Sequence, residues 1–157
     1  MAAEFRVGYG WDSHEFASGR PLLLGGIAIE HSKGLKGHSD GDVLLHALCD
    51  ALLGALSLGD IGTHFPSNDA RWRGASSDRF VAHALALVQQ KGWRVVNADA
   101  TVILEKPRLQ PHSARIRESL ARLLNIPLEC ASVKAKTPEG MGTDNAAIAH
   151  AIVLLAK

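Results

Sequence analysis

Hydrophobic residues recur along this chain with two periods, every second residue in some segments and every third or fourth in others. Alternation is typical of strands, and the longer period is typical of helices. Glycine pairs and polar stretches separate these segments, which indicates turns and loops. In chain order the pattern predicts strands over 5–14, 22–24 and 27–29, a loop over 31–37, a helix over 40–58, a loop over 66–76, a helix over 78–90, a strand over 93–104, a helix over 111–124, a strand over 132–135, a loop over 137–142 and a helix over 145–155.

The segment over 40–58 is apolar on almost every side. A helix of this kind has to be covered on several faces, and burial inside an oligomer would provide that cover. Ser39 or Asp40 can cap its first turn, and Gly59 ends it. The mixture of strands and helices, in a chain of 157 residues, predicts a single α/β or α+β domain with one core.

The balance of charged residues and the absence of a long apolar run limit the kinds of partner that the chain can bind. The chain has 17 basic and 16 acidic side chains, so it offers no basic stripe for nucleic acid and no acidic tail. No apolar run approaches the roughly 18 residues of a membrane span. A small molecule is therefore the expected partner, with neither nucleic acid nor a membrane.

The two cysteines bear on the compartment. Cys49 and Cys130 are isolated in apolar surroundings, which predicts two buried thiols in a reducing environment rather than a disulfide. The first motif starts at Gly8, which leaves no room for a signal or transit peptide. We therefore expect a cytoplasmic protein of bacterial type. A plastid leader removed from the mature chain is the alternative.

Three potential metal ligands lie in two of the predicted elements. Asp12 and His14 are two residues apart on a strand and project from one face, which Gly8 and Gly10 leave bare for something to approach. His46 lies in the second turn of the next helix and can point at a strand packed beside it. One carboxylate and two imidazoles suit Zn²⁺, and three protein ligands leave a fourth position open for catalysis.

Several ordered motifs together resemble a known family. The first two are Gly8-x-Gly10-x-Asp12-x-His14 and His38-Ser39-Asp40-Gly41-Asp42-Val43-x-x-His46. The others lie at 50–55, 58–62, 65–66, 97–99, 111–112 and 133–139.

On these motifs the chain is similar to the 2-C-methyl-D-erythritol 2,4-cyclodiphosphate synthase family over nearly all its length. The resemblance implies one cyclodiphosphate synthase domain over 1–157, with a β-sheet covered on one side by helices. It also implies a homotrimer, with sheets toward the threefold axis and active sites shared between neighbouring subunits.

The resemblance implies a reaction in the non-mevalonate (MEP) pathway of isoprenoid biosynthesis. The 2-phosphate of 4-diphosphocytidyl-2-C-methyl-D-erythritol 2-phosphate attacks the β-phosphorus of the diphosphate and releases CMP. A phosphate oxygen is already anionic at neutral pH, so the obstacle is bringing two anionic phosphates together in line. The resemblance assigns Zn²⁺ to Asp12, His14 and His46, and to Glu139 a second ion, Mg²⁺ or Mn²⁺, that bridges the substrate phosphates.

Individual site residues are likewise implied by the resemblance. The residues implied for catalysis are His38, Ser39, Thr137 and Glu139. Those implied for substrate binding are Asp12, His14, His38, Ser39, Asp60, Ile61, Gly62, Phe65, Asp69, Leu104, Lys106, Pro107, Arg108, Leu109, Ala135, Lys136 and Thr137. By the resemblance, the segment from Leu104 to Gln110, with Ala135 to Thr137, would bind cytidine, on the subunit adjacent to the zinc ligands.

Simpler roles compete for several of these residues. Ser39 can be a helix cap, whereas helix formation does not require His38. Asp60 can be a loop residue after a helix, and Lys106 and Arg108 can belong to a solvated loop. Two further carboxylates, Asp42 and Asp50, are spaced four residues either side of His46. Each could orient that imidazole or simply be solvated or capping.

The chain also departs from the family pattern. The loop over 140–145 is shorter and lacks an arginine, which puts an anion or isoprenoid pocket on the trimer axis in doubt. Ser67 stands where aspartate is common, although Asp69 is nearby. Two other classes stay open: a zinc-dependent phosphohydrolase, and a non-catalytic trimeric binding module whose closed zinc site would need His38 as fourth ligand.

Overall fold

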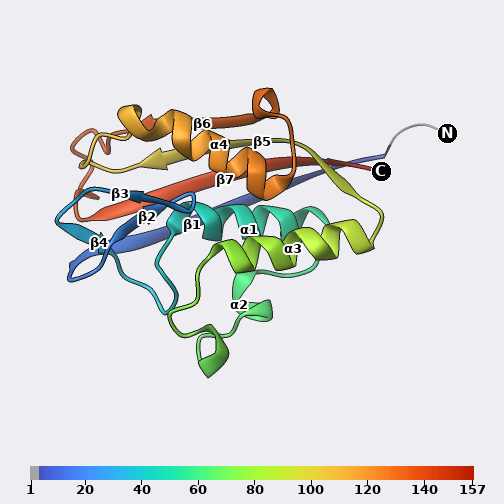
Figure 1. Ribbon diagram of the computed structural model, residues 1–157, viewed down its shortest axis with the longest axis horizontal. Helices are drawn as coiled ribbons and strands as arrows, with labels where there is room; N and C mark the ends of the chain where they lie inside the picture. Colours follow the sequence, from blue (N-terminus) through green and yellow to red (C-terminus); the bar gives the residue numbers. More distant parts are fainter. Residues whose placement is uncertain (1–3) are drawn as a thin grey trace.

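The computed structural model describes residues 4–157, which form a sheet packed against helices (Figure 1). Short 3₁₀ turns lie over Ala70–Trp72, Gln110–His112 and Leu128–Cys130. The helices and strands are β1 (Phe5–Ser18), β2 (Leu22–Leu24), β3 (Ile27–Ile29), β4 (Lys33–Leu35), α1 (Val43–Ala55), α2 (Ile61–His64), α3 (Asp78–Gln90), β5 (Arg94–Ile103), α4 (Ser113–Leu124), β6 (Ala131–Lys136) and β7 (Ala146–Ala156).

The main sheet has five strands in the order β4-β1-β7-β5-β6. All its pairings are antiparallel except β5 with β6, which are parallel and are connected through α4. β2 and β3 form a separate hairpin, as the glycine pair between them predicts. The prediction of one α+β domain is confirmed. None of the helices in residues 4–157 combines the length and apolar character that a membrane crossing requires.

The backbones of β1 and α1 pack in direct contact. A Cβ on Gly8 would lie 1.8 Å from the carbonyl oxygen of Ala51, and one on Gly10 would lie 1.8 Å from that of Ala47. Only glycine allows a helix backbone to approach so closely. The face of β1 that was expected to be bare is therefore covered by α1. This contact sets the distance between His46 and the strand.

The prediction of a helix over 145–155 is wrong, because this segment is the central strand β7. Its buried residues alternate through Ala147, Ala149, Ala151, Val153 and Leu155, with less buried residues between them. β7 pairs with β1 on one side and β5 on the other. Alanine is the strongest helix former, but differences in intrinsic propensity are below about 1 kcal/mol per residue for most residues, and the backbone hydrogen bonds to two neighbouring strands outweigh them.

Smaller corrections concern element ends. The loop expected over 31–37 contains β4, which pairs with the end of β1 because β1 continues to Ser18. α1 starts at Val43, with Asp42 as its N-cap in place of Ser39 or Asp40, and it ends before Gly59. The 3₁₀ turn precedes α4, so that helix starts at Ser113. The predicted helix over 78–90 is confirmed.

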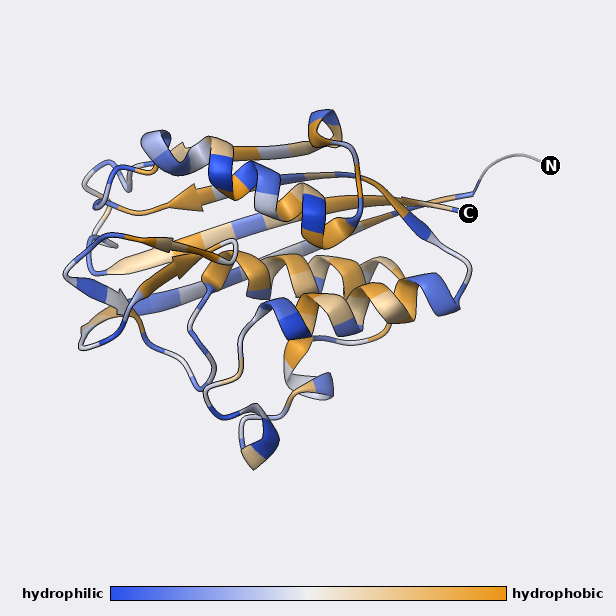
Figure 2. Ribbon diagram, in the orientation of Figure 1, coloured by the Kyte–Doolittle hydropathy of each residue, from blue (hydrophilic) through white to orange (hydrophobic). Residues whose placement is uncertain are grey.

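One face of the sheet is covered by a helix, and the other is exposed in the single chain. One face packs on α1, which Figure 2 shows as mostly hydrophobic, and every residue of that helix except Asp50 and Gly54 is buried. The other face carries large apolar side chains that are exposed in the single chain. These are Phe5, Val7, Tyr9, Trp11 and Ile152.

Candidate metal centre

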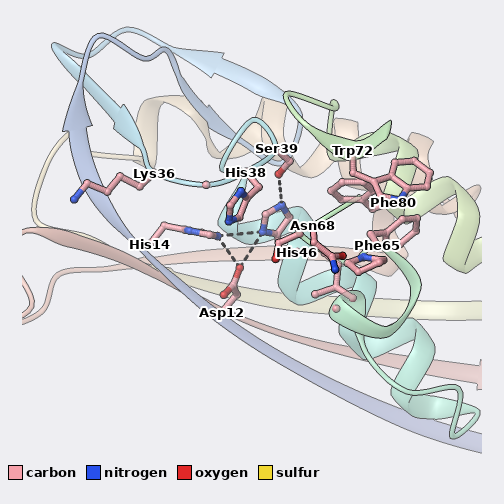
Figure 3. A pocket seen from close by; sticks show the side chains of 15 residues that line it. Asp12, His14, Lys36, His38, Ser39, His46, Phe65, Asn68, Trp72 and Phe80 are labelled. Atoms are coloured by element: carbon pink, nitrogen blue, oxygen red, sulfur yellow. Dashed lines mark hydrogen bonds and ion pairs between the residues drawn. The ribbon is translucent and has the colours of Figure 1, made fainter. Parts of the chain in front are cut away.

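β1 and α1 bring three potential metal ligands to one point (Figure 3). Asp12 Oδ2 lies 2.9 Å from His14 Nε2 and 3.0 Å from His46 Nδ1, and the two nitrogens are 3.1 Å apart. All three ligand atoms lie within 4.8 Å of one another. Two imidazole nitrogens and a carboxylate oxygen are donors that a divalent transition metal accepts, so the set could hold such an ion.

The charge of Asp12 is strongly stabilised. Burial alone would raise the pKa of this carboxyl, but the hydrogen bond with His14 and favourable charge interactions with both imidazoles outweigh burial and lower the pKa well below its usual range. Asp12 is therefore ionised throughout the neutral pH range. This is the state that metal binding needs.

Serine hydroxyls, not carboxylates, contact the far side of the His46 ring. His46 Nε2 lies 3.0 Å from Ser39 Oγ and 2.9 Å from Ser77 Oγ. The predicted alternatives, Asp42 and Asp50, do not orient the imidazole. They serve the backbone instead.

Each of those two carboxylates holds a specific segment. Asp42 caps α1 by accepting from Leu45 N–H, and it also accepts from the N–H groups of Gly25 and Gly26, which ties the hairpin to the helix. Asp50 accepts from Ile61 N–H at 2.7 Å and so fixes the start of α2. Asp50 therefore holds the segment that begins at Ile61, and Asp42 holds the start of the helix that carries His46.

A cavity of about 770 Å³ opens beside the three ligands (Figure 3). This volume is in the range of small-molecule sites. Of the predicted substrate residues, those that line it are Asp12, His14, His38, Ser39, Ile61, Gly62 and Phe65. The lining residues that sequence reasoning did not assign are Lys36, Gly37, Pro66, Ser67, Asn68, Trp72 and Phe80.

Hydrogen bonds to its backbone carbonyl groups fix the loop that carries His38 and Ser39. The guanidinium of Arg20 donates to the carbonyl oxygens of Gly37 at 2.9 Å and Ser39 at 2.6 Å. Gly74 N–H donates to the carbonyl oxygen of His38 at 2.8 Å. Nothing local in the sequence indicates the part that Arg20 takes, because its partners lie 17 and 19 residues away.

Two predicted substrate carboxylates take structural roles in the single chain. Asp60 is the N-cap of α2 and accepts from both the N–H and the hydroxyl of Thr63. Asp69 caps the 3₁₀ turn over Ala70–Trp72 and pairs with Arg71. Neither lines the cavity, so their substrate contacts stay predictions.

The residues implied for cytidine binding gather at a different place. They line a second cavity of about 620 Å³ at the ends of β5 and β6, which shares no lining residue with the first. Its lining includes Leu104, Lys106, Pro107, Arg108, Leu109, Ala135, Lys136 and Thr137. Glu139 accepts a hydrogen bond from Thr137 Oγ1 and lies outside the Asp12 cluster of its own chain.

Comparisons with known proteins agree with this geometry. A model of the YgbB family matches residues 5–156. The 2-C-methyl-D-erythritol 2,4-cyclodiphosphate synthase of Xanthomonas campestris pv. campestris is 53% identical over 160 residues, which cover 100% of this chain and 98% of the relative.

Solved structures give the same result. One structure of 2C-methyl-D-erythritol-2,4-cyclodiphosphate synthase has a TM-score of 0.91 and 46% identity, covering 96% of this chain and 99% of that one. A second, described as a CDP-bound form, has a TM-score of 0.91 and 44% identity with the same coverage. By sequence and by fold, the chain belongs to the YgbB family and is similar along its whole length to 2-C-methyl-D-erythritol 2,4-cyclodiphosphate synthases.

Proposed function

We propose that this chain is a 2-C-methyl-D-erythritol 2,4-cyclodiphosphate synthase of isoprenoid biosynthesis. In the reaction, an oxygen of the substrate 2-phosphate forms a bond to the β-phosphorus, and the bond from that phosphorus to the bridging oxygen of CMP breaks. CMP leaves with that oxygen and the electron pair. No side-chain base is needed, because the attacking oxygen is already anionic.

The observation that carries the proposal is the cluster of Asp12, His14 and His46 at the wall of a cavity of about 770 Å³. These three side chains would hold Zn²⁺, and Glu139 would hold Mg²⁺ or Mn²⁺. When bound, such ions polarise phosphoryl oxygens and neutralise the charge that develops on the leaving phosphate. The residues themselves supply donor atoms from a strand and from the start of the helix packed on it.

Other lining groups would position the substrate. His38 and Ser39 stand on the loop above the ligands and can donate to phosphate oxygens (Figure 3). The backbone of Ile61 and Gly62 lines the same cavity and can serve the hydroxyls of the methylerythritol chain. Thr137 can donate to a phosphate at the second cavity. Each contact would restrict the substrate toward the in-line geometry and so lower the entropic cost of reaching it.

We infer that the active enzyme is a homotrimer whose sites combine two subunits. Each chain carries both cavities, and they share no lining residue. A substrate with a nucleotide at one end and a phosphorylated chain at the other would bridge the first cavity of one subunit and the second cavity of its neighbour. The exposed apolar face of β1 and β7 supports this assembly, because monomers seldom leave such a face in water.

Isotopic water tests the reaction class. Cyclisation joins two groups that the substrate already holds, so turnover in H₂¹⁸O should leave the diphosphate product free of ¹⁸O. A zinc hydrolase would place one solvent oxygen in its product. Mass spectrometry of the product distinguishes the two, and label in the phosphate product would contradict the synthase proposal.

The substitution His38→Ala tests whether the metal site is open. If His38 serves the substrate, the variant should keep its zinc and lose turnover, because the three ligands remain. If zinc is structural with His38 as fourth ligand, the variant should lose the metal. Zinc content and turnover measured on one preparation decide between these roles.

A further inference from the structure

The carboxylate of Asp40 is surrounded by hydrogen-bond donors. Its Oδ1 accepts from Asp42 N–H at 3.1 Å and from the hydroxyl of Ser77, and its Oδ2 accepts from Ser77 N–H at 2.9 Å. Ser77 is fully buried, at 0% exposure. Both backbone and side chain of Ser77 are thus turned toward Asp40, across a gap of 37 residues in the sequence.

This pairing fixes the direction of the next hydrogen bond. A serine hydroxyl has one proton, and Ser77 donates its proton to Asp40. The oxygen of Ser77, which lies 2.9 Å from His46 Nε2, can then only accept. His46 Nε2 must therefore carry a hydrogen, which leaves Nδ1 as the nitrogen with the free lone pair.

The free lone pair is the one that the metal centre needs. His46 Nδ1 is the atom that lies 3.0 Å from Asp12 Oδ2 and 3.1 Å from His14 Nε2. Without Ser77, the carboxylate of Asp12 would favour a proton on Nδ1, because a proton there would bridge the two groups. That tautomer blocks metal binding, since one proton would have to be displaced before the nitrogen could coordinate.

The same direction determines what Ser39 can do. Ser39 Oγ lies 3.0 Å from the protonated Nε2 and so accepts from it, sharing that hydrogen with Ser77. Its own hydroxyl proton remains free, and Ser39 lines the cavity. Ser39 can thus donate to an anionic ligand, whereas Ser77 and Asp40 do not line the cavity and act only through His46.

We propose that Asp40 and Ser77 are positioning residues that hold His46 in the tautomer whose Nδ1 binds the metal. The role in metal binding rests on the metal site proposed above, while the tautomer itself is a property of the metal-free protein. Partners of this kind are a general feature of metal-binding histidines, and their loss typically weakens metal binding about 10- to 100-fold.

Ser77→Ala tests the proposal, with Ser76→Ala as a matched control. Ser76 is the neighbouring serine, is exposed, and hydrogen-bonds to Asp78 instead of the imidazole. Two readouts are needed: the ¹⁵N chemical shifts of the His46 ring in metal-free protein, and zinc affinity by competition with a chromophoric chelator. A thermal melt confirms that each variant is folded.

The parent and Ser76→Ala should show a protonated Nε2 and the same zinc affinity. In Ser77→Ala the hydrogen should shift toward Nδ1, and zinc affinity should fall about tenfold or more. Asp40→Asn is a second test variant. Its amide can donate a hydrogen bond to Ser77 Oγ, so that the Ser77 hydroxyl can donate to His46 Nε2 instead of accepting from it. The hydrogen on the ring should again shift toward Nδ1, and zinc affinity should again fall.

Unchanged ring shifts and unchanged zinc affinity in folded Ser77→Ala would overturn the positioning role. Failure of the parent protein to bind zinc would instead overturn the metal site of the proposed function. The ring shifts of metal-free protein would still report whether Ser77 sets the tautomer. The two failures are therefore distinguishable.

Discussion

The two cavities of this chain are built by different means. The metal cavity has its ligands on β1 and α1, whose backbones touch at Gly8 and Gly10. The second cavity lies where β5 and β6 end, and most of its wall is the loop over 104–110. The first holds three ligand side chains, two of them spaced two residues apart on one strand, whereas the lining of the second comes mostly from one loop. The spacing of the ligands is therefore visible in the sequence, and the lining of the loop cavity is not.

Under the proposed function, neither cavity is a complete site by itself. The metal cavity offers donors for phosphates but is separate from the loop that would bind a nucleotide. The exposed apolar face between β1 and β7 provides the surface through which a neighbour could bring its loop close. The predictions that follow separate what each cavity contributes.

The largest effect should come from removing a metal ligand. Asp12→Ala or His46→Ala should lower turnover about 1,000-fold or more, because several kcal/mol of charge stabilisation are lost with the ion. Bound zinc should fall in parallel, while the oligomer stays assembled. Glu118→Ala, which removes an exposed carboxylate from outside both cavities, is the control. Normal activity in either ligand variant would refute the assignment of the three ligands.

The next effect comes from blocking the second cavity. Ala135 is exposed at the end of β6 and lines that cavity, so Ala135→Trp should obstruct it. We expect kcat/KM to fall about 100-fold, which corresponds to roughly 2.7 kcal/mol. Zinc content should equal that of the parent, because the metal cavity is untouched. Loss of zinc in this variant would show that the two cavities are not independent.

Mixing the two inactive variants tests whether sites are shared. Asp12→Ala has an intact second cavity, and Ala135→Trp has an intact metal cavity. Trimers reassembled from equal amounts should recover about a quarter of parental activity, since each site then combines one random cavity of each kind. Recovery indistinguishable from zero in mixed, zinc-loaded trimers would mean that each chain uses its own two cavities.

A smaller effect concerns how the free energy of unfolding of the metal-free protein depends on pH. The folded pKa of Asp12 lies below its ordinary value of 3.8, so the stability it contributes is complete above pH 3.8 and is lost as the pH falls through the folded pKa. The parent should exceed Asp12→Asn in free energy of unfolding by on the order of 1 kcal/mol. Urea titrations from pH 7 to pH 3 should show that this gap narrows as the pH falls below 3.8. A gap that did not narrow there would contradict a folded pKa of Asp12 below its ordinary value.

The smallest effect distinguishes the two cysteines. Both are free thiols, but Cys49 is buried in α1 and Cys130 is only partly buried before β6. Burial, with a further contribution from Asp50, raises the pKa of the Cys49 thiol well above its usual range. Iodoacetamide should therefore alkylate Cys130 and leave Cys49 intact in the folded protein. Mass spectrometry of tryptic peptides measures this directly, and modification of Cys49 at the rate of Cys130 would show that α1 opens.

The sequence predicted those parts of the fold that depend on local periodicity. Helix α3 and the hairpin of β2 and β3 have clear patterns and lie where expected. The sequence pattern favours a helix over β7, because this segment is apolar at nearly every position and so shows no alternation that would indicate a strand. Its partners, β1 and β5, are more than forty residues away in sequence, so only tertiary pairing identifies it as a strand.

The candidate site divides in the same way. Asp12 and His14 are close in sequence on one strand, and the strand period alone puts them on one face. Ser77 and Arg20 could not be found from local pattern, because each acts on a residue of another element. Asp60 is an intermediate case, since its place in a loop after a helix was readable, its role as the N-cap of α2 was not, and its substrate contact is still a prediction.

The most direct test of the proposed function is phosphorus NMR of the purified protein with 4-diphosphocytidyl-2-C-methyl-D-erythritol 2-phosphate. Spectra are recorded with added metal, after chelation and after the metal ions are restored. We predict a cyclic diphosphate with one CMP for each molecule formed, lost on chelation and regained on restoration. Linear phosphate products, or an unchanged substrate in the metal-loaded sample, would contradict the synthase assignment.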